Sequence, residues 1–290
     1  VNVKEKGNAS SFLLTGSFLG PVIGPAATVA LLSIFGWHMV FILFGLVGFV
    51  MAYFWYKYVP ENPADSPYVN KEELAFIQEG RGTADTKKEV APWGKLFRST
   101  QFWAIGIQYF ITDYVMFVFL SWLPLYLMEV HGFSLAKMGM WAALPWLTLI
   151  IITFGAGYVC DKAIAAGGSQ YWIRTITGAS GIVLCSIALY MATLTHNPIL
   201  NVMWLSISLG SLGMTFNASW ACAINLGGKF AGSVSGWMNF WGNVGGVIAP
   251  TLTAWIATAY SWDAALLATA FSGIIGVIAW IFVHPDKSIV

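Results

Sequence analysis

Charged residues are scarce in this chain: Asp, Glu, Lys and Arg make up 9% of its 290 residues, against about 25% in a soluble domain. Hydrophobic residues make up 58%, and the mean hydropathy is +0.70. A chain this apolar cannot hide all of its hydrophobic side chains in one core, which indicates several membrane spans. Basic residues form no tract and do not alternate with aromatic ones, so we expect no nucleic acid partner.

Cysteines and catalytic motifs are also few. Cys160, Cys185 and Cys222 form no CxxC pair, which argues against a disulfide framework and a zinc site; we expect each to be a small buried residue. The four histidines have no second ligand at metal spacing, so we predict no metal and no cofactor. The absence of GxSxG, HExxH, a P-loop and paired intramembrane carboxylates argues against an enzyme, which leaves a polytopic membrane enzyme as a remote alternative.

Long apolar runs dominate the chain instead. A helix needs about 20 apolar residues to cross the hydrocarbon core of a bilayer. Eight stretches are long enough, at approximately 9–33, 37–58, 101–128, 138–160, 172–194, 199–225, 230–258 and 262–283. The predicted fold class is therefore an all-α membrane protein with eight transmembrane helices, and its surroundings are the lipid bilayer.

One long polar connection divides these spans. Residues 59–100 are rich in Pro, Glu and Lys, and they separate two spans from six. Within this loop, Asn70 is predicted to cap a short amphipathic helix in 67–80. The sequence thus predicts three parts, residues 1–58, the loop, and residues 101–290.

The basic residues favour one side of the membrane. Of the 14 Lys and Arg residues, all except Lys137 lie on the side shared by the two ends of the chain. Because Lys and Arg favour the cytoplasmic side, both ends are predicted to be cytoplasmic. The chain does not begin with Met and shows no signal-peptide order, so we expect further spans upstream of "VNVKEKGNAS".

Asp113 is the one acid well inside a predicted span. A carboxylate at the bilayer centre costs at least about 2.5 kcal/mol, so such a group usually faces a bundle interior or a water-filled cavity. We interpret it as an ion-coupling site or a substrate contact, with a structural carboxyl bonded to a neighbouring helix, or a protonated residue without a function, as the alternatives. Tyr114 is expected in a cavity wall, because its hydroxyl needs a partner at that depth. Tyr126 is expected in the interfacial aromatic belt.

The later spans carry uncharged polar residues. Asn239 and Asn243 share one face of span seven, while Gly242 and Gly246 form a second, tight face. The two amides can bind a polyhydroxylated ligand or hold helices together, and we favour helix contact for Asn243. Ser219 in span six has the same two interpretations, a cavity contact or packing.

A charged cluster is predicted where spans four and five meet the cytoplasm. Its members are Gly157, Asp161, Lys162 and Arg174. Opposite charges at helix ends can form an interhelical salt-bridge lock, which we interpret as a cytoplasmic gate; a solvated loop is the alternative.

Four segments of the chain form a recognisable set. They are "GSFLGPVIGPAATVALLSIFGWHMVFILFGLVGF", "DYVMFVFLSWLPLYLMEVHGFS", "GYVCDK" and "AGSVSGWMNFWGNVGGVIAPTLTAWI". Together with the span pattern, they resemble the anion:cation symporter branch of the major facilitator superfamily, which includes hexuronate, galactonate, glucarate and sialin-like carriers. That family's fold has twelve helices in two halves of six. The resemblance implies that this chain corresponds to helices 5–12.

The resemblance also implies transport by alternating access, with the substrate midway between the two halves. The implied substrates are small organic anions, often sugar acids, taken up with H⁺ or Na⁺. By resemblance, Tyr114, Ser219 and Asn239 lie on cavity-facing parts of the second half, and Ser17 lies on the cavity side of span one. The family more often has Asn where Asp113 stands, and it can have Gln where Ser17 stands.

The stretch "TGSFLGPVIGPAA" suggests an alternative within the superfamily. Gly16, Gly20 and Gly24 share one helix face and allow another helix to come close, and Pro21 and Pro25 bend the helix. The stretch is similar to the GxxxGPxxG motif of drug antiporters. An organophosphate or drug antiporter is therefore the alternative to a sugar-acid symporter.

The predicted spans lack a charged partner for an anion. We expect no Lys or Arg within any of the eight spans, and the resemblance places the key basic and acidic groups in the first four helices of the family. The 290 residues alone are therefore expected neither to bind nor to transport. The whole protein is expected to be a monomer in a bacterial inner membrane.

Overall fold

The computed structural model of the chain describes residues 6–60, 63–79 and 90–289. It divides the chain into two compact units, Val1–Glu89 and Val90–Val290. The boundary between them falls inside the predicted polar loop 59–100.

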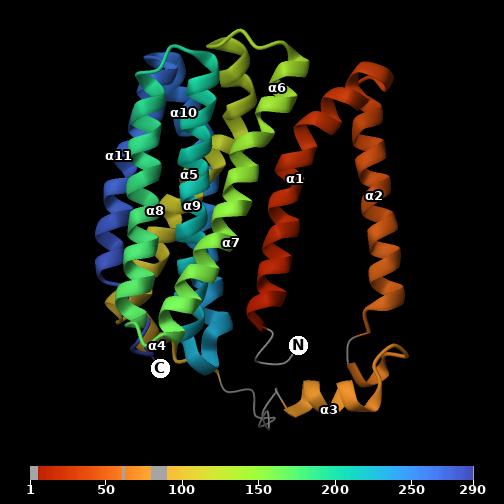
Figure 1. Cartoon of the computed structure of the whole chain (residues 1–290), viewed down its shortest axis with the longest axis vertical. Coiled ribbons are helices and arrows are strands. Elements are labelled where there is room, and N and C mark those ends of the chain that lie inside the picture. The colour runs from red at the N-terminus through yellow and green to blue at the C-terminus, as the bar shows by residue number, and fades with distance from the viewer. Residues whose placement is uncertain (1–5, 61–62, 80–89, 290) are drawn as a thin grey trace. The chain divides into compact units, whose positions relative to one another are not determined.

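The first unit contains two long helices joined at one glycine. Helix α1 spans Lys6–Phe35 and α2 spans Trp37–Tyr58, and they meet at Gly36, whose φ of 75° is a left-handed conformation that favours glycine (Figure 1). A 3₁₀ turn, η2 (Pro63–Asp65), precedes α3 (Lys71–Glu79). The Asn70 side chain accepts a hydrogen bond from the Glu73 amide at 2.7 Å, which confirms the predicted helix cap.

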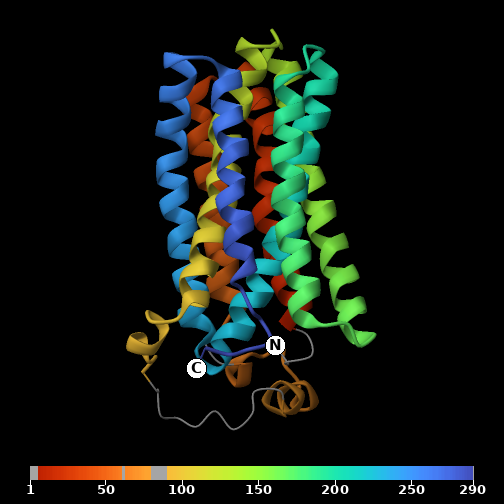
Figure 2. The ribbon, with the colours of Figure 1, turned by 90° about the vertical axis from the view of Figure 1, so that its left-hand side faces the viewer.

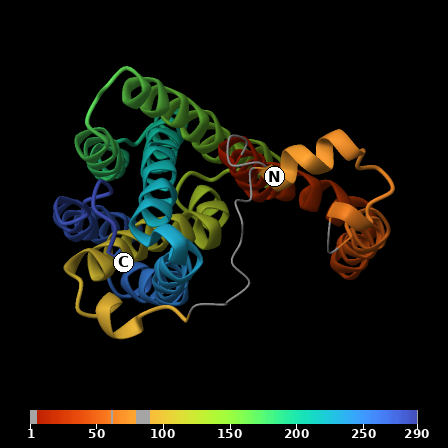
Figure 3. The ribbon, with the colours of Figure 1, turned by 90° about the horizontal axis from the view of Figure 1, so that it is seen from below.

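The second unit is a helical bundle. Its elements are α4 (Trp93–Leu96), α5 (Thr100–Glu129), α6 (Leu135–Trp141), α7 (Ala143–Ala165), α8 (Gln170–Thr193), α9 (Pro198–Gly227), η3 (Gly228–Phe230), α10 (Ala231–Ala259) and α11 (Trp262–Ile281). The long helices run side by side and are joined by short connections (Figure 2). Helix α9 packs against α7, α8 and α10, and α5 packs against α10 and α11 (Figure 3). Helices α5 and α9 therefore each contribute more buried residues than any other helix of the described chain.

Two of the predicted spans differ in detail from the helices. The fourth is interrupted at Ala142, between α6 and α7. Pro145 follows in the first turn of α7; proline has no amide hydrogen to bond with the carbonyl four residues earlier, so the helix breaks there.

The sixth and seventh spans join into one continuous helical stretch. In the described part of the chain, seven helical stretches are long and apolar enough to cross a membrane, and the longest, Pro198–Ala259, has 62 residues. A straight helix of that length would measure about 93 Å, about three times the hydrocarbon core. The chain instead turns at η3, where Gly228 has a φ of 50°, and α9 packs against α10. This stretch therefore supplies two spans, which gives the eight that the sequence predicts.

Basic residues near the ends of several helices lie together at one end of the bundle, here called the basic end. It includes Lys95, Arg98, Lys162, Arg174, Lys229 and Lys287. The segment after α11 crosses this end: the His284 amide donates to Gln101 Oε1 at 3.3 Å, and the Ile289 amide donates to the Leu226 carbonyl at 3.0 Å. These bonds tie the first turn of α5 and the last turn of α9 to the segment that follows α11.

Candidate functional site

Two helices of the second unit approach each other along a row of glycines, here called the α5–α10 seam. It comprises Gly106, Tyr109, Phe110, Asp113, Tyr114 and Phe117 of α5, and Trp237, Trp241, Gly242, Gly245 and Gly246 of α10. A Cβ atom added at Gly245 would lie 2.5 Å from the Phe110 carbonyl oxygen, and one at Gly246 would lie 2.7 Å from the Phe117 ring. The predicted tight glycine face of span seven is thereby confirmed, and its partner is α5.

Asp113 lies in the middle of this seam. Its side chain is 5% exposed, and a methyl group added at Gly242 would overlap its Oδ2 atom. The Oδ1 atom is buried, and no described residue forms a hydrogen bond with it. The structure thus shows no bond at Oδ1 for a structural carboxyl, and the roles of Asp113 in coupling or as a protonated residue without a function stay predictions.

Next to Asp113, polar side chains connect α5 to α9. The hydroxyl of Ser219, which is fully buried, lies 3.1 Å from Gln108 Oε1 and 2.7 Å from the Thr215 carbonyl oxygen, and its single hydrogen is shared between these two acceptors. The Trp220 indole N–H donates to the Tyr109 hydroxyl at 3.0 Å. We call Gln108, Tyr109, Asp113, Ser219 and Trp220 the mid-bundle polar cluster. Ser219 is thus enclosed within the bundle and not on its surface.

The two predicted tyrosine positions differ in outcome. Tyr114 is 5% exposed, and its ring stacks on Phe110 with centroids 6.5 Å apart; its role in a cavity wall stays a prediction. The aromatic-belt position predicted for Tyr126 is wrong. Its side chain is 4% exposed, and its hydroxyl accepts a hydrogen bond from Asn201 Nδ2 at 3.0 Å, because the side of α5 that carries Tyr126 faces α9.

The two amides of α10 lie beside the glycine face, on the part of the helix that the bundle leaves exposed. Both Asn239 and Asn243 are exposed, and the Asn243 amide donates to the Asn239 carbonyl of its own helix at 2.8 Å. Neither amide bonds to another helix of the second unit among the described residues. In the first unit, Ser17 is exposed on α1. All three remain candidates for ligand contact.

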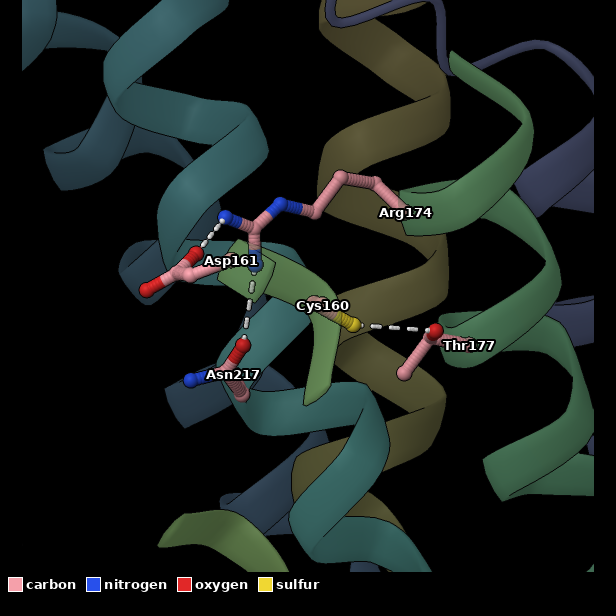
Figure 4. A network of polar contacts seen from close by, with 5 residues as sticks. All are labelled: Cys160, Asp161, Arg174, Thr177 and Asn217. Carbon is pink, nitrogen blue, oxygen red and sulfur yellow. Dashed lines mark hydrogen bonds and ion pairs between the residues drawn. The ribbon is translucent and has the colours of Figure 1, made fainter. Parts of the chain in front are cut away.

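At the basic end, Arg174 joins three helices (Figure 4). Its guanidinium donates to Asp161 Oδ1 on α7 and to Asn217 Oδ1 on α9, at 2.6 and 3.0 Å. The predicted salt bridge between the ends of spans four and five is therefore confirmed as an ion pair. We call Gly157, Asp161, Arg174 and Asn217 the basic-end clamp.

The remaining members of the predicted charged cluster lie differently. Gly157 leaves room for Asn217, since an added Cβ would lie 2.6 Å from its Nδ2 atom. Lys162 is exposed and donates to the Tyr158 hydroxyl at 3.2 Å on its own helix, so it takes no part in the clamp.

The expectation that no basic residue lies within a span is wrong. Arg174 belongs to α8, which begins at Gln170, and it is only 7% exposed. The charge is tolerated because Asp161 and Asn217 bond with it. Those same bonds use one N–H of each terminal nitrogen of its guanidinium, and its Nε–H is buried with no hydrogen bond among the described residues. The charge of Arg174 is already paired with Asp161 in this arrangement.

Three buried polar residues that form hydrogen bonds between helices were not predicted from the sequence. Gln108 is fully buried and connects α5 to α9. Asn201 connects α9 to Tyr126 and to the Ala192 carbonyl, and Tyr109 accepts the Trp220 bond. Gln108 lies within the same span as Asp113, five residues before it, and a strongly polar residue inside a span is the signal that could have marked it.

A bundle of membrane-length helices with a buried carboxyl, an exposed amide stripe and a charged clamp at one end defines a polytopic helical membrane protein. The chain belongs to the Major Facilitator Superfamily, whose family model matches residues 1–250.

Relatives support this placement. The chain is 30% identical to the probable galactarate/D-glucarate transporter GudP of Bacillus subtilis (strain 168), with 99% of this chain and 65% of that protein covered. It is 28% identical to the chloroplastic ascorbate transporter of Arabidopsis thaliana, over 99% of this chain and 53% of that protein.

A solved structure shares the fold. The crystal structure of a bacterial homologue of the human lysosomal transporter Spinster matches with a TM-score of 0.65 at 15% identity, and it covers 98% of this chain and 72% of that one. The chain spans about half the length, 47–55%, of several curated relatives it matches.

Proposed function

We propose that the protein is a secondary active transporter that moves a small organic anion across the membrane by alternating access, coupled to H⁺ or Na⁺. The observation that carries this proposal is the 30% identity to a galactarate/glucarate transporter along 99% of the chain. A hexuronate, galactonate or glucarate is therefore the proposed substrate class. The chain supplies eight helices of a twelve-helix assembly in this proposal, and it has no catalytic role.

The exposed stripe of α10 is the proposed substrate contact in the second unit. Asn239 and Asn243 are exposed, and amides can both donate to and accept from the hydroxyl and carboxylate groups of a sugar acid. Ser17 on α1 and Tyr114 on α5 complete the proposed contacts. Ser219 is assigned to the support of the site, because its hydroxyl already bonds with Gln108 inside the bundle.

The basic-end clamp is the proposed cytoplasmic gate. Its ion pair holds α7 to α8, and Asn217 adds α9, so its formation and release would change the packing of three helices at one end. The concentration of Lys and Arg at this end supports a cytoplasmic orientation for it and for both ends of the chain. A bacterial inner membrane and a monomeric state complete the proposal.

Ion-driven uptake tests the proposed function. Membrane vesicles from cells that produce the whole twelve-helix protein of this proposal receive labelled galactarate, glucarate, galactonate or glucuronate in the outside solution, under an imposed H⁺ or Na⁺ gradient. We expect accumulation that depends on one of the two gradients and that unlabelled sugar acids inhibit. Accumulation only against a preloaded internal organophosphate would favour the antiporter alternative, and no flux of any of these substrates would contradict the proposal.

The coupling role of Asp113 has its own test. Asp113→Asn keeps the size of the side chain but cannot release a proton, so we expect the pH dependence of uptake to shift or flatten. Asn239→Ala is the comparison: it is expected to weaken the apparent affinity for substrate while the pH profile stays in place. An unchanged pH profile with normal affinity in Asp113→Asn would make Asp113 a structural residue.

A further inference from the structure

The α5–α10 seam encloses the Asp113 side chain closely, so the stability of the closed seam depends on whether the carboxyl group is charged. The side chain is 5% exposed, Oδ2 lies against the Cα of Gly242, and Oδ1 is buried without a hydrogen bond from any described residue. A carboxylate removed from water without compensating donors is strongly unfavourable, whereas the uncharged acid is tolerated much better.

No element packed on the seam supplies a compensating charge. Helices α9 and α10 contain no Asp, Glu, Lys, Arg or His over Pro198–Gly227 and Ala231–Ala259. On α11 the one ionisable residue is Asp263, in its first turn. On α5 itself, the titratable group nearest in the chain on the Asp113 face is Tyr109, whose oxygen accepts the Trp220 bond.

We propose that the seam closes around Asp113 only when this residue carries a proton, and that Gly242 is the positioning residue that makes the closed seam possible. This inference rests on the coupling role proposed above for Asp113. It names the separation of α10 from α5 as the movement to which proton binding is coupled. Ionised Asp113 needs water, and separation of α10 from α5 would admit it to the Oδ2 side of the carboxyl. Closure of the seam therefore takes up one proton, and opening releases it, by the reciprocity that links proton binding to conformation.

The separation of the two helices can be measured directly in the lipid-embedded protein. Spin labels at Leu120→Cys on α5 and Val247→Cys on α10 occupy exposed positions, 45% and 76% accessible, while the three native cysteines are buried. Distances between the labels are recorded without substrate from about pH 5 to about pH 9, the range over which buried carboxyl groups release their protons. We expect a longer-distance population that grows as the pH rises.

Two matched carboxyl variants decide the cause of any pH response. Asp113→Asn is expected to keep the short distance at every pH, because its side chain stays uncharged. Asp263→Asn removes a carboxyl at the far end of α11 and is expected to respond like the unchanged protein. A pH-independent distance in the unchanged protein, or the same pH response in Asp113→Asn, would overturn the proposal.

Gly242→Ala tests the positioning role. The added methyl group takes the place of the carboxyl oxygen, so we expect the longer-distance population at acidic as well as alkaline pH. If this variant does not fold, the two carboxyl variants decide the proposal by themselves. The experiments also distinguish failure of this inference from failure of the proposed function. A pH-responsive seam in a protein without sugar-acid uptake would contradict the transport proposal alone. Uptake with a pH-independent seam would contradict this inference alone.

Discussion

Ser219 and Asn239 are both polar residues inside membrane-length helices, but their surroundings differ. The Ser219 hydroxyl is enclosed and donates to Gln108, whereas the Asn239 side chain is exposed. A buried polar group left without its partner costs more than the bond itself contributes. Substitution of Ser219 should therefore change the stability of the bundle, whereas substitution of Asn239 should change the affinity for substrate.

Ser219→Ala should destabilise the bundle and leave substrate selectivity in place. The loss leaves Gln108 Oε1 buried without its donor, which costs about 1–3 kcal/mol. Unfolding followed in lipid or mild detergent measures the change. The comparison is Asn239→Ala, which should unfold like the unchanged protein but take up substrate with lower apparent affinity. The reverse pattern, normal stability and weakened affinity in Ser219→Ala, would move Ser219 into the substrate site.

His131, between α5 and α6, gives the second unit a pH-dependent stability. Burial lowers the pKa of His131 below its ordinary value of 6.5, although Asn201 and the Asp263 carboxylate favour the charged form. The unfolded chain therefore binds a proton more readily than the folded one as the pH falls below about 6.5, so stability falls over that window and levels off below the lowered pKa.

Thermal unfolding at a series of pH values checks this expectation. His131→Gln should flatten the acid side of the stability profile. His196→Gln, an exposed histidine at the end of the α8–α9 connection, should leave the profile unchanged. Equal profiles for His131→Gln and the unchanged protein would show that another group causes the acid sensitivity.

At the scale of elements, α10 contains glycines in two kinds of surroundings, one in close contact with α5 and one in open space. Gly245 lies against the α5 backbone, so that an added Cβ would be 2.5 Å from the Phe110 oxygen, whereas an added Cβ at Gly236 would meet no atom within 4 Å. The seam depends on the first kind of glycine, because only a missing side chain lets the two backbones come this close.

Gly245→Ala should therefore weaken the packing of α5 on α10. Overpacking of this kind costs about 1–3 kcal/mol. Gly236→Ala is the matched control and should be neutral or stabilising by up to about 1 kcal/mol, since alanine favours a helix more than glycine does. Unfolding of the two variants under one condition gives the comparison, and equal stabilities would show that the seam tolerates a methyl group.

The basic-end clamp is a contact between three elements, and a double-mutant cycle measures it. The Asp161 side chain is 71% exposed, so its pairing with Arg174 should contribute only about 0.5–1 kcal/mol of coupling to the free energy of unfolding. The control cycle pairs Arg174→Ala with Lys162→Ala, which should show no coupling because Lys162 contacts Tyr158 instead. Equal coupling in both cycles would mean that the ion pair adds nothing specific.

At the scale of the whole molecule, the first unit is the part with the least internal packing. Only Val40 is buried among the residues of α2, and the membrane-length windows of α1 and α2 are each 6% buried. Most of their apolar surface is therefore available to lipid or to other helices. The relatives of which this chain covers about half have additional length that could supply such helices.

The 290 residues alone are accordingly expected neither to bind nor to transport a sugar acid. The buried arginine is already paired within the clamp, and an exposed amide stripe without a cation binds an anion weakly. Uptake of labelled galactonate or glucuronate is compared between vesicles that contain only these residues and vesicles that contain the chain together with four preceding helices. Uptake by the first preparation would contradict the expectation.

The sequence alone predicted the helices closely, because the signals that define them are local. A span requires about 20 successive apolar residues, and the eight predicted spans correspond to eight membrane-length helices, with the fourth interrupted at Ala142. The cap at Asn70 involves a residue three positions away. The glycine face of α10 also followed from spacing, since a helix fixes which of its own residues lie together.

The partners of those faces depended on the tertiary structure. Asn217 is 43 residues from Arg174, and Ser219 is 111 residues from Gln108; no local pattern reports such pairs. Tyr126 was assigned to the lipid interface by its residue type, yet the packing of α5 on α9 buries it. In a membrane bundle nearly every position is apolar, so hydrophobicity marks where a helix crosses but not which side faces protein. Only the arrangement of neighbouring helices decides that.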